Sequence, residues 1–304
     1  MFGTGETRDP EKKAQSPSTH DVRGIGDEIE MVRWLEETGR YRVLRKLKAR
    51  AIANAPRPGF PMRGVIVDTE TTGLSARKDE IIEIGIVAFS FDKTGNIGDV
   101  TGIYCGLQRP SIAIPANITR LTGITDAMVA GQTIDIARVQ ALIAPADLIV
   151  AHNAGFDRPF CETFSRAFAP KAWACSVSEV DWSARGFEGT KLGRAVDDCF
   201  ALLEVLAQSG PDQGNTPFAE LFAASQRSRV RIFAEHSPFE MKDNLKARGY
   251  RWSDGTDGRP KSWWVEVADD MLDEELRYLR AEIYRWPDAD PPIRRLTALE
   301  RFKA

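Results

Sequence analysis

Two acidic residues, Asp68 and Glu70, stand two positions apart directly after the apolar run 65–67. Alternate residues of a strand point to the same side of a sheet, so this pair would place two carboxylates on one face. Two negative charges this close repel each other unless a cation neutralises them. Carboxylate oxygens are the ligands that Mg²⁺ and Mn²⁺ prefer. The pattern therefore predicts a divalent-metal site, although an Asp-x-Glu pair alone is common on surface strands.

Two more acidic motifs lie further along the chain. The stretch AHNAGFD, residues 151–157, ends in Asp157 after a short apolar run. The stretch RAVDDCFALLEVL, residues 194–206, carries Asp197 and Asp198 within a predicted helix. Helical periodicity does not separate these two neighbours as candidate ligands.

The three motifs, taken in order, resemble those of a known family. VIVDTETTGL at 65–74, AHNAGFD and RAVDDCFALLEVL resemble the motifs of the DEDD, or DnaQ-like, superfamily of 3′–5′ exonucleases. Within it, the likeness is to the exonucleases that resemble the epsilon subunit of bacterial DNA polymerase III. The resemblance covers residues 63–208, about half of the chain, and implies a ribonuclease H-like fold.

The resemblance implies the identity of the metal ligands and of the cofactors. It assigns Asp68, Glu70, Asp157 and Asp198 as catalytic residues that bind two divalent ions, Mg²⁺ or Mn²⁺. Asp68 would bridge both ions, Glu70 and Asp198 would help to hold one, and Asp157 the other. The implied reaction is two-metal hydrolysis of a terminal phosphodiester.

The resemblance also points to residues near the substrate. Thr69 and Leu74 match positions that contact the 3′-terminal nucleotide through backbone and packing. His152 and Asn153 follow the fourth predicted strand, close to the same site. For His152, a structural hydrogen bond is the favoured interpretation.

One expected residue is missing from the pattern. The family's general base is a His five positions before the last Asp, or a Tyr four positions before it. These positions hold Gly193 and Arg194, and the interval from Asp157 to Asp198 is shorter than the family usually shows. The simplest explanation is that a helix, a turn and the His are absent between Lys191 and Arg194. Loss of general-base assistance would cost roughly 10²–10⁴-fold in rate.

The predicted fold class is α/β, a ribonuclease H-like mixed sheet flanked by helices. Apolar runs at VIVD, DEIIEIGIVAF and TGIYCGLQ predict an antiparallel meander, ADLIVAHN predicts a fourth strand, and helices lie between and after them. The predicted parts are a flexible leader at 1–21, a helix/strand extension at 22–62, the exonuclease domain at 63–208 and a small α+β module at 218–304.

The C-terminal module places Tyr250, Trp252, Trp263 and Trp264 on a predicted hairpin, among basic residues. Basic and aromatic side chains together suit single-stranded nucleic acid, whose bases stack on rings. The other interpretation, favoured for a small module, is that the tryptophans form its core.

The composition indicates a globular protein, with 42% hydrophobic and 28% charged residues and a net charge of −3. No apolar run is long enough to span a bilayer, and the polar N-terminus lacks the apolar segment of a secretory signal. The four cysteines form no CxxC pair, which favours buried reduced thiols and a cytoplasmic location.

Three functions compete at this point. The first is a metal-dependent 3′–5′ exonuclease that acts on the single-stranded 3′ end of DNA in proofreading or repair, with a DNA polymerase as candidate partner. The second is an exoribonuclease of the same superfamily. The third is an inactive nuclease fold that binds nucleic acid or a polymerase, which Gly193 favours. No membrane partner is expected.

Overall fold

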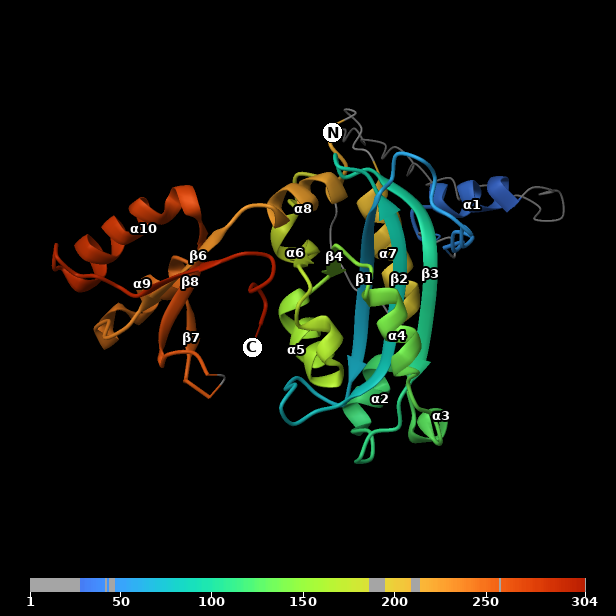
Figure 1. The fold of residues 1–304 in the computed structure, drawn as a ribbon, viewed down its shortest axis with the longest axis horizontal. Helices are drawn as coiled ribbons and strands as arrows, with labels where there is room; N and C mark the ends of the chain where they lie inside the picture. The colour runs from blue at the N-terminus through green and yellow to red at the C-terminus, as the bar shows by residue number, and fades with distance from the viewer. Residues whose placement is uncertain are drawn as a thin grey trace, which may run out of the picture. The chain divides into compact units, whose positions relative to one another are not determined.

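The computed structural model describes residues 28–41, 43, 47–185, 195–208, 214–256 and 258–303. It divides the chain into two compact units, 1–46 and 47–304. The described part of the first unit contains helix α1, Glu28–Glu37 (Figure 1). This helix lies within the part of the chain, 22–62, expected to form a helix/strand extension.

The larger unit contains a five-stranded sheet with the order β3-β2-β1-β4-β5. Its strands are β1 (Met62–Thr71), β2 (Ile81–Phe91), β3 (Ile97–Leu107), β4 (Leu148–Ala151) and β5 (Trp173–Cys175). Strands β1, β2 and β3 pair antiparallel, whereas β4 runs parallel to β1 and β5 parallel to β4. The predicted meander and mixed sheet are confirmed. Strand β5 was not predicted because three residues are too short for a periodic signal.

Helices cover both faces of this sheet (Figure 1). They are α2 (Ala116–Thr122), α3 (Asp126–Val129), α4 (Ile136–Ile143), α5 (Ala154–Phe164), α6 (Ser176–Glu179), α7 (Ala195–Ala207) and α8 (Pro217–Ser225), with a 3₁₀ turn at Arg166–Phe168. The sheet with helices on both sides confirms the predicted α/β class, in the ribonuclease H-like arrangement that the resemblance implied.

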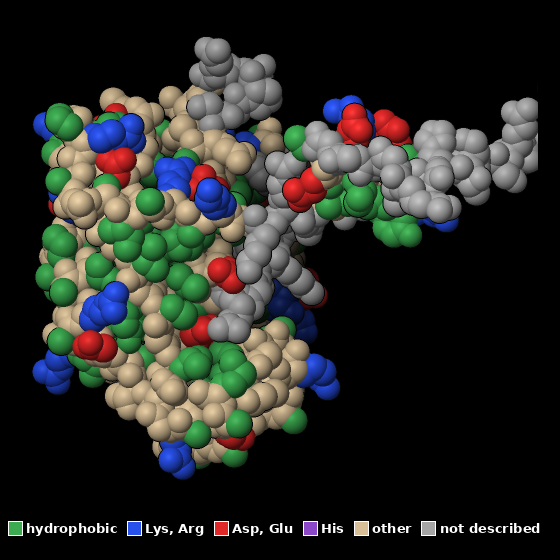
Figure 2. Space-filling view, turned by 90° about the vertical axis from the view of Figure 1, so that its right-hand side faces the viewer, with side chains coloured by type: hydrophobic (Ala, Val, Ile, Leu, Met, Phe, Trp, Pro, Cys, Tyr) green, Lys and Arg blue, Asp and Glu red, His purple; other side chains and the backbone are tan. Residues whose placement is uncertain are grey.

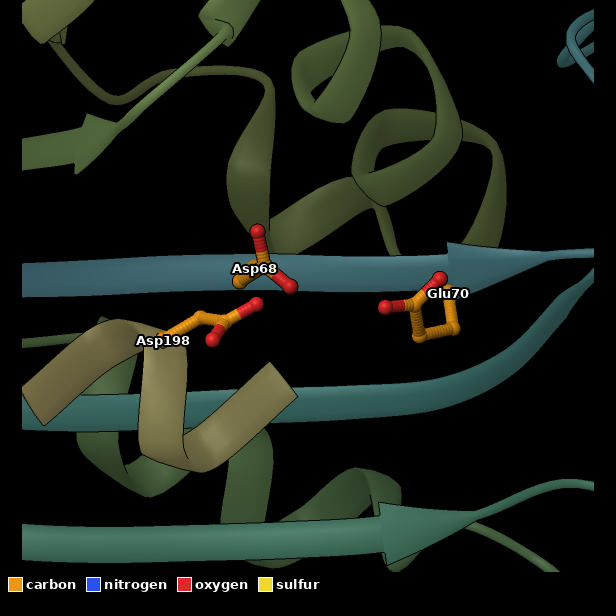
Figure 3. Close-up of side chains that lie close together, drawn as sticks. All are labelled: Asp68, Glu70 and Asp198. Carbon is orange, nitrogen blue, oxygen red and sulfur yellow. The ribbon is translucent and has the colours of Figure 1, made fainter. Parts of the chain in front are cut away.

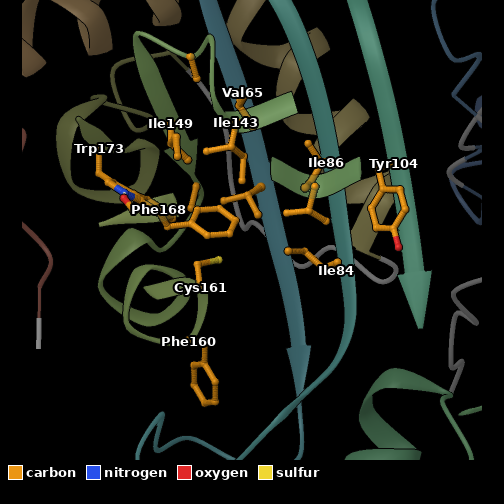
Figure 4. Close-up of a cluster of buried hydrophobic side chains, with 14 of the residues drawn as sticks. Val65, Ile84, Ile86, Tyr104, Ile143, Ile149, Phe160, Cys161, Phe168 and Trp173 are labelled. Atoms are coloured by element: carbon orange, nitrogen blue, oxygen red, sulfur yellow. The ribbon is translucent and has the colours of Figure 1, made fainter. Parts of the chain in front are cut away.

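The alternation of β1 separates two buried clusters. Val65 and Val67 pack with α4, α5 and β5 in one cluster, part of which Figure 4 shows around Trp173 and Phe168. Ile66 packs with residues of α7 and α8 in the other. Since side chains alternate along a strand, the next even-numbered residue of β1, Asp68, lies on the face that α7 covers.

Helix α8 packs on the five-stranded sheet. The Phe218 ring lies 5.2 Å from Phe89 and 5.1 Å from Phe91, both edge-on. Thr216 begins this helix by accepting a hydrogen bond from the backbone of Ala219, and Pro217 occupies the first turn, where its missing N–H costs nothing. The predicted boundary at 218 therefore falls within an element that belongs to the core of this sheet, and the domain limits stay predictions.

The C-terminal module has a second sheet, with the order β7-β8-β6-β9. Its elements are β6 (Arg229–Ala234), α9 (Lys242–Ala247), β7 (Arg251–Ser253), β8 (Ser262–Ala268), α10 (Leu272–Tyr278) and β9 (Ile293–Leu296), with short helical turns at Phe239–Met241, Asp269–Met271 and Leu279–Tyr284. Strands β7 and β8 pair antiparallel, which confirms the predicted hairpin. Residues 269–284 form three consecutive helical segments.

The cysteines need one correction. Cys161, Cys175 and Cys199 are buried free thiols, as expected, but Cys105 is exposed. Cys105 lies on β3, the edge strand of the sheet, where one side of the strand is left uncovered. Among the described residues, no helix is both long and apolar enough to cross a membrane.

Candidate metal centre

Three carboxylates meet between β1 and α7. Ligand oxygens of Asp68, Glu70 and Asp198 all lie within 4.8 Å of one another. In Figure 3 the carboxylates of Asp68 and Asp198 face each other, and Glu70 lies further along the same strand. Oxygen-only donor sets of this kind suit hard divalent cations, so the residues fit the predicted metal.

A close approach of backbone to backbone sets the position of Asp198. A Cβ at Gly85 would lie 2.4 Å from the carbonyl carbon of Ala195, so only glycine lets the start of α7 approach β2 this closely. One turn further on, the Cys199 thiol donates to the Gly85 carbonyl at 3.4 Å. The structure also separates the two neighbours, because Asp197 is exposed while Asp198 is 8% exposed and belongs to the cluster.

Asp157 lies beside these three carboxylates, in the first turn of α5. Its side chain is 3% exposed. Its Oδ1 accepts hydrogen bonds from the backbone N–H of Thr69 at 3.1 Å and from the Thr69 hydroxyl at 2.8 Å. Asp157 is not among the three residues whose ligand atoms lie within 4.8 Å of one another.

The electrostatics of this cluster reflect several carboxylates held close together. Burial, followed by the charges of Asp157, Asp198 and Glu70, raises the pKa of Asp68 to about 9. Burial also raises the pKa of Asp157 to about 7, although the hydrogen bonds from Thr69 act to lower it. A divalent cation would remove this repulsion and favour the ionised carboxylates.

The predicted substrate residues fall into two groups. Leu74 is 88% exposed, and both Leu74 and Asn153 line a cleft next to the centre. Thr69 is 5% exposed and gives its backbone N–H and its hydroxyl to Asp157, so in this structure it positions a carboxylate. His152 Nδ1 pairs with the Ser176 hydroxyl at 2.8 Å, which supports a structural role, and burial lowers its pKa.

One acidic residue near the centre was not predicted. Glu83 is 1% exposed and lies directly across from Glu70 on β2. Its carboxylate accepts the backbone N–H of Ala195 at 3.4 Å, so it contacts the start of α7. The available signal was its place in the apolar run IIEIG, where a charged residue is unusual. The predicted replacement of the general base at Gly193 lies outside the described residues.

The partly buried carboxylate cluster on a mixed sheet is one observation on the class of this protein, and comparison with known proteins supplies another. Residues 65–181 match the family RNase_T, described as Exonuclease. The match spans the strand with Asp68 and Glu70 and the helix with Asp157. Together with the relatives below, it supports the membership of this domain in the DEDD exonuclease superfamily.

The relatives are similar over a limited part of the chain. The DNA polymerase III PolC-type protein of Clostridium perfringens is 39% identical over 112 residues, 36% of this chain and 7% of that protein. The DNA polymerase III subunit epsilon of Treponema pallidum is 39% identical over 95 residues, 31% of this chain and 41% of that protein. The chain therefore spans less than half of each of these two relatives.

Solved structures show weaker similarity. Escherichia coli exonuclease I in complex with a dA16 oligonucleotide is 13% identical with a TM-score of 0.46, over 73% of this chain and 71% of that one. Exonuclease X in complex with 5′ overhanging duplex DNA is 24% identical with a TM-score of 0.29, over 53% of this chain and 86% of that one.

Proposed function

We propose that this protein is a divalent-metal-dependent 3′–5′ exonuclease that acts on DNA. The observation that carries the proposal is the gathering of Asp68, Glu70 and Asp198 within 4.8 Å, with Asp157 beside them. Like charges held together in a partly buried site need a cation. Their order along the chain matches that of the exonuclease motifs.

Each carboxylate has a distinct role in this proposal. Asp68 would help to hold both ions, Glu70 and Asp198 would help to hold one of them, and Asp157, which accepts hydrogen bonds from Thr69, would help to hold the other. When bound, the ions supply an activated water and stabilise the oxygen that leaves the terminal phosphorus. The exposed Leu74 side chain and Asn153 lie where the 3′-terminal nucleotide would pack.

A second candidate is a metal-binding nuclease fold with little turnover, used to bind nucleic acid. The observation that favours it is Gly193, where a general-base His is expected. In that case the carboxylates would still bind metal, and hydrolysis would be slower by roughly 10²–10⁴-fold.

The substrate and partner follow from the relatives' names. Both named relatives are components of DNA polymerase III, so DNA is the first substrate to test, with a proofreading or repair role and a DNA polymerase as the partner. RNA is the alternative substrate of the same superfamily.

The test uses single-stranded DNA and RNA labelled at the 5′ end, with Mg²⁺, Mn²⁺ or EDTA. A 3′–5′ exonuclease produces a ladder of labelled products that shorten one nucleotide at a time. Asp68→Asn should abolish the ladder while preserving the fold, whereas Asp197→Asn, one residue from a proposed ligand and exposed, should keep it. Metal-dependent stabilisation without cleavage would select the inactive fold, and cleavage that survives Asp68→Asn would contradict the site.

A further inference from the structure

The C-terminal sheet has one apolar and one basic face. Along β8, Trp263, Val265 and Val267 pack on the module's buried core. The alternate residues Trp264 and Glu266 must point to the opposite face. On β6 the same alternation buries Val230 and Ile232 in that core and turns Arg229 and Arg231 to the side of Trp264. This second face therefore carries an aromatic ring among guanidinium groups.

Trp264 lies at the centre of three arginines. The guanidinium carbon of Arg259 lies 4.7 Å from its ring centroid, that of Arg231 4.9 Å and that of Arg251 5.6 Å. Cations attract an aromatic ring at these separations. Arg231 is 6% exposed and forms an ion pair with Glu266 at 2.5 Å, which keeps this guanidinium in place. The Trp264 ring itself is half-buried, so part of it stays accessible.

This face lines a cleft with a volume of about 640 Å³. The cleft is bordered by six basic side chains and two acidic ones. The basic residues are Arg77, Arg229, Arg231, Arg251, Arg259 and Lys303. Both acids are already paired, Glu179 with Arg301 and Glu266 with Arg231. The cleft is therefore a positive surface, as a polyanion requires.

The same cleft also borders residues that stand close in the chain to proposed metal ligands. Its lining includes Leu74, at the loop that follows β1, and Asn153 and Phe156 at the start of α5. Phe156 directly precedes Asp157 in the chain. A strand that lies against Trp264 would pass Leu74, which is proposed to contact the 3′-terminal nucleotide, whereas the four proposed ligands do not themselves line the cleft.

Another face of the molecule offers a contrast. In the described residues of the view in Figure 2, Lys and Arg side chains are interspersed with Asp, Glu and apolar side chains. The combination of an accessible indole, surrounding guanidiniums and the nearby Leu74 and Asn153 points to the cleft rather than to a general surface charge.

We propose that Trp264, with Arg251 and Arg259, binds the single strand upstream of the 3′ end that enters the metal centre. The indole stacks on a base, and the arginines contact the backbone phosphates. The inference rests on the proposed exonuclease function only for the statement that the 3′ end enters the metal centre. Binding of the strand to the cleft is measurable without catalysis. It assigns the C-terminal module a role in substrate affinity.

The first experiment measures binding of fluorescein-labelled oligothymidylate by anisotropy in EDTA, where no hydrolysis interferes. Trp264→Ala should weaken binding by about 10-fold or more, since loss of base stacking costs roughly 1–3 kcal/mol per base. Trp264→Tyr should retain most of the affinity because it keeps a ring. Trp286→Ala is the matched control: Trp286 is 58% exposed on the same module but does not line the cleft.

A salt titration tests the phosphate contacts. Arg251→Ala should reduce the slope of log K against log salt by about 0.7 for one lost contact to a single strand. Arg277→Ala, an exposed arginine of α10, should leave the slope unchanged. Unfolding curves of all variants identify any loss of affinity that comes from misfolding. If Trp264→Ala does not fold, the affinities of Trp264→Tyr and Arg251→Ala decide whether the cleft binds the strand.

The second experiment separates the failure of this inference from that of the proposed function. The p-nitrophenyl ester of thymidine 5′-phosphate is small enough to occupy the metal centre alone. Trp264→Ala should cleave it as wild type does, while KM for oligothymidylate rises. If the wild-type protein binds the oligomer but cleaves neither substrate, the proposed exonuclease function is wrong, and the proposal of a strand-binding cleft still stands. If Trp264→Ala keeps the wild-type affinity and KM, the proposal that the cleft binds the strand is wrong, and the proposed exonuclease function is unaffected.

Discussion

The carbonyl carbon of Ala195 lies so close to Gly85 that a Cβ on residue 85 would stand 2.4 Å from it. This contact joins β2 to the first turn of α7, three residues before Asp198. The geometry of the metal centre thus depends on a residue that has no side chain.

Gly85→Ala should therefore damage the centre without touching a ligand. The added methyl group meets backbone atoms, which cannot rotate away, so α7 must shift, at a cost of roughly 1–3 kcal/mol. We expect a lower melting temperature and a loss of most of the stabilisation by Mn²⁺. Thermal unfolding with and without Mn²⁺ measures both effects.

Gly102→Ala is the matched control for this change. Gly102 is a buried glycine on β3, where the added Cβ would lie 2.4 Å from Leu142 Cδ2. That atom ends a flexible side chain and can move. Stabilisation by Mn²⁺ should persist in Gly102→Ala, and an equal loss in both variants would argue against the role of Gly85.

Asp68→Asn should stabilise the metal-free protein while abolishing hydrolysis. Asp68 lies partly buried beside three other carboxylates, and its pKa of about 9 means that folding must protonate or desolvate this carboxyl, a cost that an amide side chain does not have. We expect a gain of about 1 kcal/mol in the free energy of unfolding in EDTA, measured by urea denaturation. In Mn²⁺ the order should reverse, because the wild type gains bound ions. A variant less stable than wild type in EDTA would show that the carboxylates do not repel one another.

Arg158 should prove essential for the attachment of the C-terminal tail. Its guanidinium is completely buried and donates to the backbone carbonyls of Leu299 at 2.7 Å, Arg301 at 2.7 Å and Ala298 at 3.2 Å. Arg158→Met would leave these acceptors without a donor, so we expect a loss of about 3 kcal/mol. Hydrogen exchange at residues 297–303 should accelerate. Arg166→Met, an exposed arginine nearby, should change neither quantity.

Asp92 gives the stability a dependence on acid pH. Its carboxylate accepts the backbone N–H groups of Thr94 at 2.8 Å and Asn96 at 2.9 Å in the turn between β2 and β3. Burial acts to raise its pKa, but the hydrogen bonds from Asn96 and Thr94 prevail and lower the pKa to about 2. A lowered folded pKa means that this contribution is complete above the unfolded value of about 3.9 and is lost as pH falls through 2.

The stability advantage of wild type over Asp92→Asn should therefore shrink as the pH falls from about 4 toward 2. Urea denaturation at several pH values measures the difference. An NMR titration of the Asp92 carboxyl carbon locates the midpoint directly, and a midpoint near the unfolded value would show that the turn does not hold the ionised form.

Much of the metal centre follows from local periodicity. The two-residue spacing of Asp68 and Glu70 on a strand places both on one face whatever the rest of the fold does. The apolar runs likewise predict the meander, because burial of a strand requires such runs. The order of the acidic motifs, through the family resemblance, predicts Asp157 and Asp198 as further metal ligands.

Choices between adjacent residues required long-range packing. Asp197 and Asp198 fit a helix equally well, and the approach of α7 to Gly85 selects Asp198. Trp263 and Trp264 are neighbours on a strand, so one must face the core and the other must not. The pattern of the chain does not say which one faces inward, because that depends on the side from which α9 and α10 cover the sheet. That packing turns Trp264 toward the cleft. The sequence does not predict this orientation, because contacts between distant segments leave no periodic pattern in either segment alone.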